Sequence, residues 1–143
     1  MKYSIYQIQL SDAQVDLINA KGHSAVPSHM AKMDMTMDFR GEKIGGLASD
    51  AWDNGYYTHV ANIEADNPNG VFHVGNVGPE DKIERLTRMS SLSVSDVIVD
   101  EEGQIIVVAP VGFVAFSFNP KIFAGADLVM MEISFNVYSL LRV

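Results

Sequence analysis

The chain has 143 residues, of which 48% are hydrophobic and 20% charged, a composition that indicates one globular domain and excludes intrinsic disorder. The absence of cysteine excludes disulfide frameworks, iron–sulfur clusters and thiol nucleophiles. The net charge of -8 argues against direct binding to nucleic acid, because a uniformly acidic surface repels phosphate. The sequence has no signal-peptide pattern and no apolar run of the roughly 18 residues that a membrane span needs, so we expect a cytoplasmic protein that binds no membrane.

The N-terminal segment predicts a strand followed by a helix. Residues 3–10 alternate polar and apolar side chains, which is the period of a strand. Ser11 and Gln14 have the spacing of a capping box, in which each side chain accepts a hydrogen bond from the other residue's backbone amide. We therefore expect a helix over residues 12–20 that buries two apolar side chains, Val15 and Ile18.

The next segment is rich in methionine. Residues 23–30 contain a proline and small polar side chains and indicate a loop. Residues 31–40 predict a strand, although methionine favours helices, because the apolar positions alternate: Met33, Met35, Met37 and Phe39. Thioethers close to His29 also suit Cu(I), but an apolar strand face explains the same spacing, so we expect no metal there.

The middle of the chain predicts short helices around one strand. A helix over residues 47–53 is expected to end near Gly55, which suits a left-handed cap. Residues 56–63 alternate as a strand, with one face formed by Tyr57, His59, Ala61 and Ile63.

Two prolines that follow each indicate the start of a helical segment. Pro68 lies in a turn cluster over residues 66–70 and is expected to open a helical turn that carries Val71 and Phe72. Pro79 predicts a second short helix, which would bury Ile83 and Leu86.

The clearest prediction is a β-hairpin with arms over residues 93–99 and 104–109. Gly103 supplies the positive φ that a bulged turn requires. Residues 112–118 predict one more strand. Together the elements predict an α+β fold, a small antiparallel sheet with a few short helices, as a single domain over residues 1–143.

Residues 119–143 form a strongly apolar C-terminal extension. Burying one large apolar side chain is worth roughly 1.5 to 3 kcal/mol, so exposing many of them would forfeit more free energy than a domain has to spare. The extension must pack on the domain or on another chain. We favour a homodimer in which this segment is exchanged.

No pattern in the sequence indicates an active site. The glycines of residues 41–46 lack the order of a phosphate-binding loop, and no Gly-x-Ser-x-Gly motif is present. A calcium loop over residues 66–77 is incomplete, because Val77 stands where a glutamate is needed. The histidines have none of the spacings that indicate zinc: His23, His29, His59 and His73. We therefore predict no catalytic residue, no metal and no organic cofactor.

Several short motifs occur together over residues 51–116. They are Ala51-Trp52 with Gly55-Tyr56, Val60-Ala61, Val71-Phe72 with Asn76, the serine-rich run of residues 89–98, Val107-Val108-Ala109 and Gly112-Phe113. With these motifs the chain resembles small uncharacterised proteins of phages and plasmids that are similar to the YodL-like domain. The resemblance implies a mobile-element origin and a mixed α+β fold, without a known activity or cofactor. In that pattern a glycine stands where this chain has Ser95, so the turn is expected to differ here.

The function expected from these features is that of a small, acidic, non-enzymatic accessory protein of a phage or plasmid. It would bind, and modulate, a host or replication protein in the host cytoplasm. The alternatives are a small hydrolase built from scattered His and Asp residues, and a structural or virion component. For a contact surface we expect aromatic residues beside a turn, although Trp52 as a core residue is the competing interpretation; they are Trp52, Tyr56, Tyr57 and His59.

Overall fold

The structure, a computed structural model, describes residues 1–116 and confirms the predicted α+β class. Its centre is a six-stranded antiparallel sheet with the strand order β3-β2-β1-β4-β5-β6. In chain order the strands are β1 (Lys2–Ile8), β2 (Tyr57–Glu64), β3 (Ile83–Arg85), β4 (Val97–Val99), β5 (Ile105–Val108) and β6 (Phe113–Ala115). The predicted hairpin is confirmed as β4 and β5, with Gly103 at a φ of 86° in the turn. Its first arm is shorter than the predicted residues 93–99, because the chain turns at Ser95 before β4 begins.

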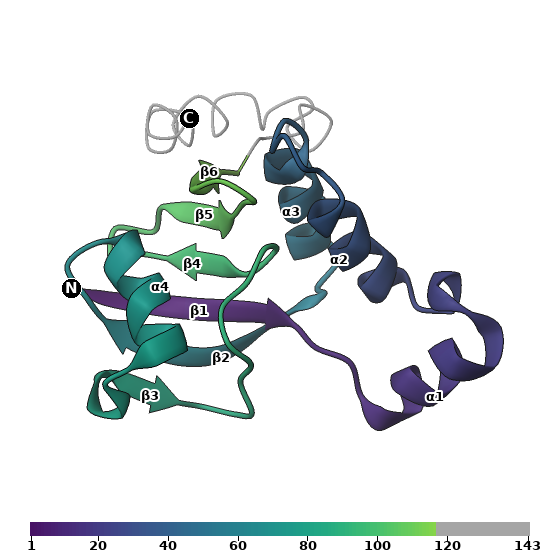
Figure 1. The fold of residues 1–143 in the computed structure, drawn as a ribbon, viewed down its shortest axis with the longest axis horizontal. Coiled ribbons are helices and arrows are strands. Elements are labelled where there is room, and N and C mark those ends of the chain that lie inside the picture. The colour runs from purple at the N-terminus through teal and green to yellow at the C-terminus, as the bar shows by residue number, and fades with distance from the viewer. Residues whose placement is uncertain (117–143) are drawn as a thin grey trace, which may run out of the picture.

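The described residues also form four α-helices (Figure 1). They are α1 (Asp12–Lys21), α2 (Pro27–Thr36), α3 (Ile44–Asp53) and α4 (Pro68–Val77), with short 3-10 helices at η1 (His23–Ala25) and η2 (Glu80–Lys82). α4 lies across one face of the sheet, and α1 stands apart from it.

Local signals in the sequence account for the helix starts. Both hydrogen bonds of the predicted capping box are formed at α1, at 2.8 and 3.1 Å. Asn67 caps α4 by accepting from the Gly70 amide at 2.8 Å. The Asp38 carboxylate accepts from the amides of Lys43 and Ile44, so a side chain just beyond α2 caps α3 and fixes the turn between the two helices.

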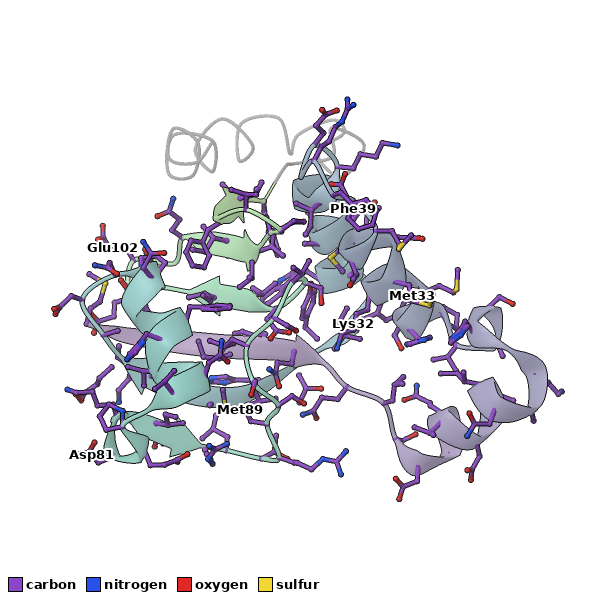
Figure 2. The ribbon with its side chains drawn as sticks, viewed as in Figure 1. Lys32, Met33, Phe39, Asp81, Met89 and Glu102 are labelled. Atoms are coloured by element: carbon purple, nitrogen blue, oxygen red, sulfur yellow. The ribbon has the colours of Figure 1, made fainter. Side chains whose placement is uncertain are left out.

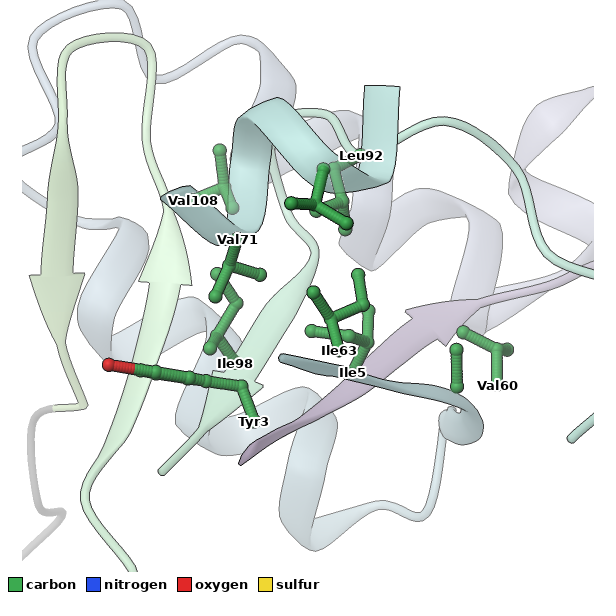
Figure 3. Close-up of a cluster of buried hydrophobic side chains, with 10 residues drawn as sticks. Tyr3, Ile5, Val60, Ile63, Val71, Leu92, Ile98 and Val108 are labelled. Atoms are coloured by element: carbon green, nitrogen blue, oxygen red, sulfur yellow. The ribbon is translucent and has the colours of Figure 1, made fainter. Parts of the chain in front are cut away.

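The face of the sheet under α4 carries the first core (Figure 3). Ile5, Ile63 and Val71 are each 0% exposed there. The cluster joins β1, β2, α4 and β4 to the segment after β3, and its buried members are Tyr3, Ile5, Val60, Ala61, Ile63, Val71, Val74, Leu92, Ile98 and Val108. Full burial of side chains of this size is worth roughly 1.5–3 kcal/mol each, so this layer is a main source of stability.

The opposite face packs on α2 and α3. Neighbouring residues of β4 and β5 alternate between the two faces, so that Ile98 belongs to the first core and Val97 to the second. The buried members of this second core are Ile8, Met35, Ile44, Ala48, Ala51, Val97, Val107, Ala109 and Phe116. The fold therefore has three layers, with the sheet between α4 and the α2–α3 pair.

A bulge interrupts the pairing of β1 with β2. Ile5 pairs with Ala61 and Tyr6 with His59, which leaves Val60 as an extra residue on β2. Val60 and Ala61 are both 0% exposed and belong to the first core. The predicted face of alternating residues in this strand is therefore wrong: His59 lies on the side opposite to Ala61, in contact with Tyr6.

The strand predicted over residues 31–40 and the loop over residues 23–30 are wrong. The segment forms η1 and then α2, which starts at Pro27 and ends at Thr36. Pro27 occupies the first helical turn, where a missing amide costs nothing, and methionine favours helices. Met35 is 0% exposed whereas Met37 is 62% exposed, so the methionines do not share one face.

Two further predictions about buried helices are wrong. α1 buries none of its residues, and Val15 is 41% exposed. The helix predicted after Pro79 is only η2, and Ile83 pairs with β2 as part of β3, because the edge of the sheet offers hydrogen bonds that a short helix cannot match. Leu86, predicted to be buried in that helix, is 49% exposed.

The apolar extension of residues 119–143, with its predicted dimer contact, lies outside the described residues.

Ser95 has a positive φ of 87°, in the turn where the resemblance places glycine. The turn is closed by the Asp96 amide, which donates to the Ser93 carbonyl at 3.1 Å. Ser95 is 0% exposed, and its hydroxyl has no hydrogen-bond partner within the described part of the chain. Both features cost free energy, since a side chain resists this φ and a buried hydroxyl has lost its water.

We expect Ser95→Gly to raise the free energy of unfolding by about 1 kcal/mol, because it relieves the strain and removes the unpartnered hydroxyl. Ser95→Ala removes the hydroxyl and keeps the strain, so it should give a smaller gain. Urea denaturation of the three proteins measures both. A glycine variant less stable than the parent would contradict the strain at this turn.

Gly75 lets α4 lie close to Leu92. A Cβ at this position would stand 2.6 Å from Leu92 Cδ1 and 3.0 Å from its Cγ, and Leu92 is only 3% exposed and cannot easily move. We expect Gly75→Ala to lower the free energy of unfolding by about 1–2 kcal/mol, despite the better helix propensity of alanine. Gly46→Ala in α3 is the matched control, because a Cβ there meets nothing within 4 Å and should stabilise by up to about 1 kcal/mol. Equal effects at both positions would argue against the close α4 contact.

Candidate functional site

Half-buried aromatic rings form a continuous group on the sheet face opposite to α4. Tyr6 stacks on His59 with ring centroids 4.7 Å apart and an angle of 18°, and it meets the edge of Trp52 at 4.7 Å and 66°. Trp52 lies 5.9 Å from Tyr57. We call this group, Tyr6, Trp52, Tyr57 and His59, the aromatic strip. It joins β1 and β2 to the C-terminal turn of α3.

The bulge at Val60 aligns the strip with polar groups farther along β2. His59 and Asn62 are three positions apart and would point to opposite faces of a regular strand. Here His59 Nε2 and Asn62 Oδ1 are 2.9 Å apart, and Asn62 Nδ2 donates to Glu84 Oε1 at 2.9 Å. The strip therefore continues as a chain of hydrogen bonds to the edge strand β3.

Three of the four predicted contact residues belong to the strip: Trp52, Tyr57 and His59. Tyr57 serves as support, because its hydroxyl donates to the Ser95 carbonyl at 2.7 Å and burial raises its pKa. Tyr56 is half-buried against the second core and takes no part in the ring contacts of the strip. Tyr6 was not predicted, since its role depends on the pairing of β1 with β2.

Carboxylates lie on two of the elements that carry the strip or its hydrogen-bond chain. Asp50 and Asp53 are exposed on the last turns of α3, the helix that carries Trp52, and Glu84 ends the hydrogen-bond chain on β3. Partial burial, and then the negative charge of Asp50, raises the pKa of Asp53. A cation bound near these two α3 carboxylates would relieve that repulsion.

A second polar centre lies where β1 ends. Gln7 Nε2 donates to the Ser90 carbonyl and to Asp96 Oδ2, each at 3.0 Å, and the Ser90 amide donates back to Gln7 Oε1. The Ser93 amide also donates to Asp96 Oδ2, at 2.9 Å. We call this set, Gln7, Ser90, Ser93 and Asp96, the glutamine–aspartate clamp. It fixes the serine-rich segment against the central strand.

Asp96 is a buried carboxylate, 1% exposed. Burial raises its pKa from 3.8 to about 6, although hydrogen bonds from Ser93 and Gln7 and the positive charge of Lys32 act in the opposite direction. Nothing in the spacing of the sequence signals this residue, because its partner Gln7 is 89 positions away.

A pocket with a volume of about 280 Å³ opens beside the clamp. It lies between the end of β1, α1, α2 and the serine-rich segment. Its charged and titratable lining residues are His29, Lys32, Arg88 and Asp96. None of the four aromatic residues of the strip lines it.

The two histidines near this pocket pair with each other. His23 Nδ1 and His29 Nε2 are 2.9 Å apart, and burial followed by the charge of His23 lowers the pKa of His29. In residues 1–116 no group of three or more His, Asp or Glu side chains is arranged to hold a metal ion. Within the same residues no helix has the length and apolar character to cross a membrane.

No family model, no curated protein and no solved structure matches this chain. Its function is therefore inferred from the geometry and charge of the two centres.

We expect the pH dependence of stability to report the buried carboxylate. Because the folded pKa of Asp96 is raised, folding binds a proton, so its favourable contribution is full below pH 3.8 and is lost as the pH rises through about 6. Relative to Asp96→Asn, the parent should lose about 2–3 kcal/mol of unfolding free energy between about pH 4 and about pH 7. Urea denaturation at both pH values measures this difference. The same pH dependence in both proteins would contradict it.

Asp96→Ala is the matched comparison. Asparagine keeps an oxygen to accept from Gln7 and Ser93, whereas alanine leaves both donors without this acceptor, which costs about 1–3 kcal/mol for a buried group. The alanine variant should therefore be the least stable of the three at neutral pH.

Proposed function

We propose that this protein is a small acidic accessory protein that acts by binding another protein, and that the partner docks a basic segment along the aromatic strip. The observation that carries the proposal is the combination of half-buried aromatic rings with exposed carboxylates on α3, which carries Trp52, and on β3, which the hydrogen bonds from His59 reach through Asn62. An arginine or lysine side chain fits such a surface, because it stacks on an aromatic ring and pairs with a nearby carboxylate.

The charge of the chain supports a basic partner. The net charge of -8 raises the rate at which a positively charged surface meets this one, and disfavours acidic competitors. Trp and Tyr are also the residue types that contribute most binding energy at protein interfaces. The strip supplies both on rigid elements, so that little conformational entropy is lost on binding.

The wider biological setting is part of the same proposal. The motifs that resemble the YodL-like domain support an origin in a phage or plasmid, and the partner is then a host or replication protein in the host cytoplasm. A homodimer formed through residues 119–143 stays a prediction from the apolar composition of that segment.

One observation favours the alternative function, a small hydrolase. His29 and the hydroxyls of the serine-rich segment line the same pocket as Asp96. However, His29 is hydrogen-bonded to His23, and the Asp96 oxygen that accepts hydrogen bonds takes them from Gln7 and the Ser93 amide. Among residues 1–116 no serine–histidine–aspartate relay is formed, so we favour binding over hydrolysis.

The test uses a short arginine-rich peptide as the probe and the intrinsic fluorescence of Trp52, the single tryptophan of the chain. We expect a saturable change in the emission, which an acidic peptide of equal length does not produce. The affinity should fall as salt is added, because the contact includes exposed charges.

Variants then locate the contact. With a labelled peptide and anisotropy detection, Trp52→Ala and His59→Ala should each weaken binding, by about 30-fold for Trp52 if it is an interface hot spot. Phe39→Ala is the matched control, because Phe39 is an aromatic residue that is 70% exposed and lies outside the strip (Figure 2). Equal losses in all three variants, or none in the strip variants, would contradict the proposal.

A further inference from the structure

The pocket beside the glutamine–aspartate clamp has the size of a small-metabolite site. Its volume of about 280 Å³ lies just below the range of roughly 300–1,000 Å³ that is usual for ligand pockets. The wall is partly apolar, with Ile8, Leu10 and Val15, and partly polar, with the hydroxyls of the serine-rich segment. A compact ligand with one apolar end and one charged end would match this lining.

The charged side chains of the pocket lack ion-pair partners. The two ion pairs found in residues 1–116 join Arg40 to Glu42 and Arg85 to Glu80. Asp96, Lys32 and Arg88 therefore have no ion pair within that part of the chain. Lys32 is near enough to lower the pKa of Asp96, yet it forms no ion pair with it.

Charges of both signs thus face one small space. The floor carries Asp96, whose two hydrogen bonds from Gln7 and Ser93 both reach Oδ2, which leaves Oδ1 for a further donor. The sides carry two cations, Lys32 and Arg88, although the chain as a whole has a net charge of -8. Lys32 lies on the side of α2 that faces the sheet (Figure 2). Of the three, only Asp96 is buried, and a buried charge is stable only when it is paired. A ligand whose cation pairs with Asp96 and whose anion pairs with the half-buried Lys32 and the exposed Arg88 therefore completes the site.

We propose that this pocket binds a small zwitterion of the α-amino acid class. Its ammonium group donates to Asp96 Oδ1, its carboxylate pairs with Lys32 and Arg88, and its side chain contacts Ile8, Leu10 and Val15. The site is separate from the aromatic strip and is independent of the proposed protein partner.

The isolated position of α1 fits a ligand in this pocket. α1 buries none of its own residues, and Val15 is 41% exposed although it lines the pocket. An apolar ligand side chain would supply the contact that Val15 lacks. Binding would then hold α1 against the body of the protein.

The experiment uses the full chain and three free amino acids as probes: L-leucine, L-valine and L-alanine. Isothermal titration calorimetry measures affinity, and protein NMR locates the shifts. We expect saturable binding at concentrations up to about 10 mM, with amide shifts at residues 88–96 and in α1. Isopentylamine lacks the carboxylate and isocaproate lacks the ammonium, so each should bind at least about tenfold more weakly than L-leucine.

Three variants test the roles of the charges. Asp96→Asn and Arg88→Gln should each weaken binding by about tenfold or more, because each leaves one ligand charge unpaired. Arg88 is exposed, so its substitution does not endanger the fold. Lys82→Gln is the control, since Lys82 is an exposed cation that does not line this pocket.

Any of three results would overturn the proposal. The first is the absence of saturable binding by any of the three amino acids. The second is binding of isocaproate as tight as that of L-leucine, and the third is unchanged binding of L-leucine by Asp96→Asn, because either would reduce the pocket to a simple anion site.

Discussion

The extra residue in β2 is the constraint on which both faces of the sheet depend. Val60 is one extra residue opposite β1, so the alternation of side chains between the two faces of the sheet shifts by one position at this point of β2. Ala61 and Ile63, after the bulge, complete the first core under α4. His59, before the bulge, and Asn62, after it, share the opposite face. A strand of the same composition without the bulge would bury histidine or expose isoleucine. One irregular position thus allows a closed core and an open polar face to use the same eight residues.

The order of elements could be read from the sequence where local chemistry decides it. The hairpin of β4 and β5 follows from a glycine in a turn between two apolar runs, and α1 follows from its capping box. The wrong prediction over residues 31–40 has a specific cause: methionines at every second position imitate a strand, while Pro27, a good helix start, also fits a loop among small polar residues. Weighing the helix propensity of methionine together with that proline would have found α2.

The residues of the candidate sites also divide into those that local sequence reveals and those that depend on the pairing of distant strands. Trp52, Tyr57 and His59 could be selected because aromatic side chains beside a turn are recognisable in the sequence itself. Tyr6 and the Gln7–Asp96 pair could not, since they acquire their roles only when β1 enters the middle of the sheet between β2 and β4. A single glutamine and a single aspartate, 89 positions apart, carry no local pattern. The serine-rich motif contributes to the resemblance, but nothing in it indicates that a buried carboxylate holds this segment in place.

The helix α1 has one more consequence, for how the chain can change over evolution. The signals that stabilise it are local, with the cap at Ser11 and with Asp12 in its first turn and Lys21 in its last favouring the helix dipole. Its side chains add nothing to either core. Substitutions, and insertions near Gly22, therefore meet no packing constraint from the sheet. Homologous chains can lengthen, shorten or replace this arm while the sheet stays the same. The segment from Ser11 to Gly22 is thus the part of the fold in which specificity can diverge at the lowest cost in stability.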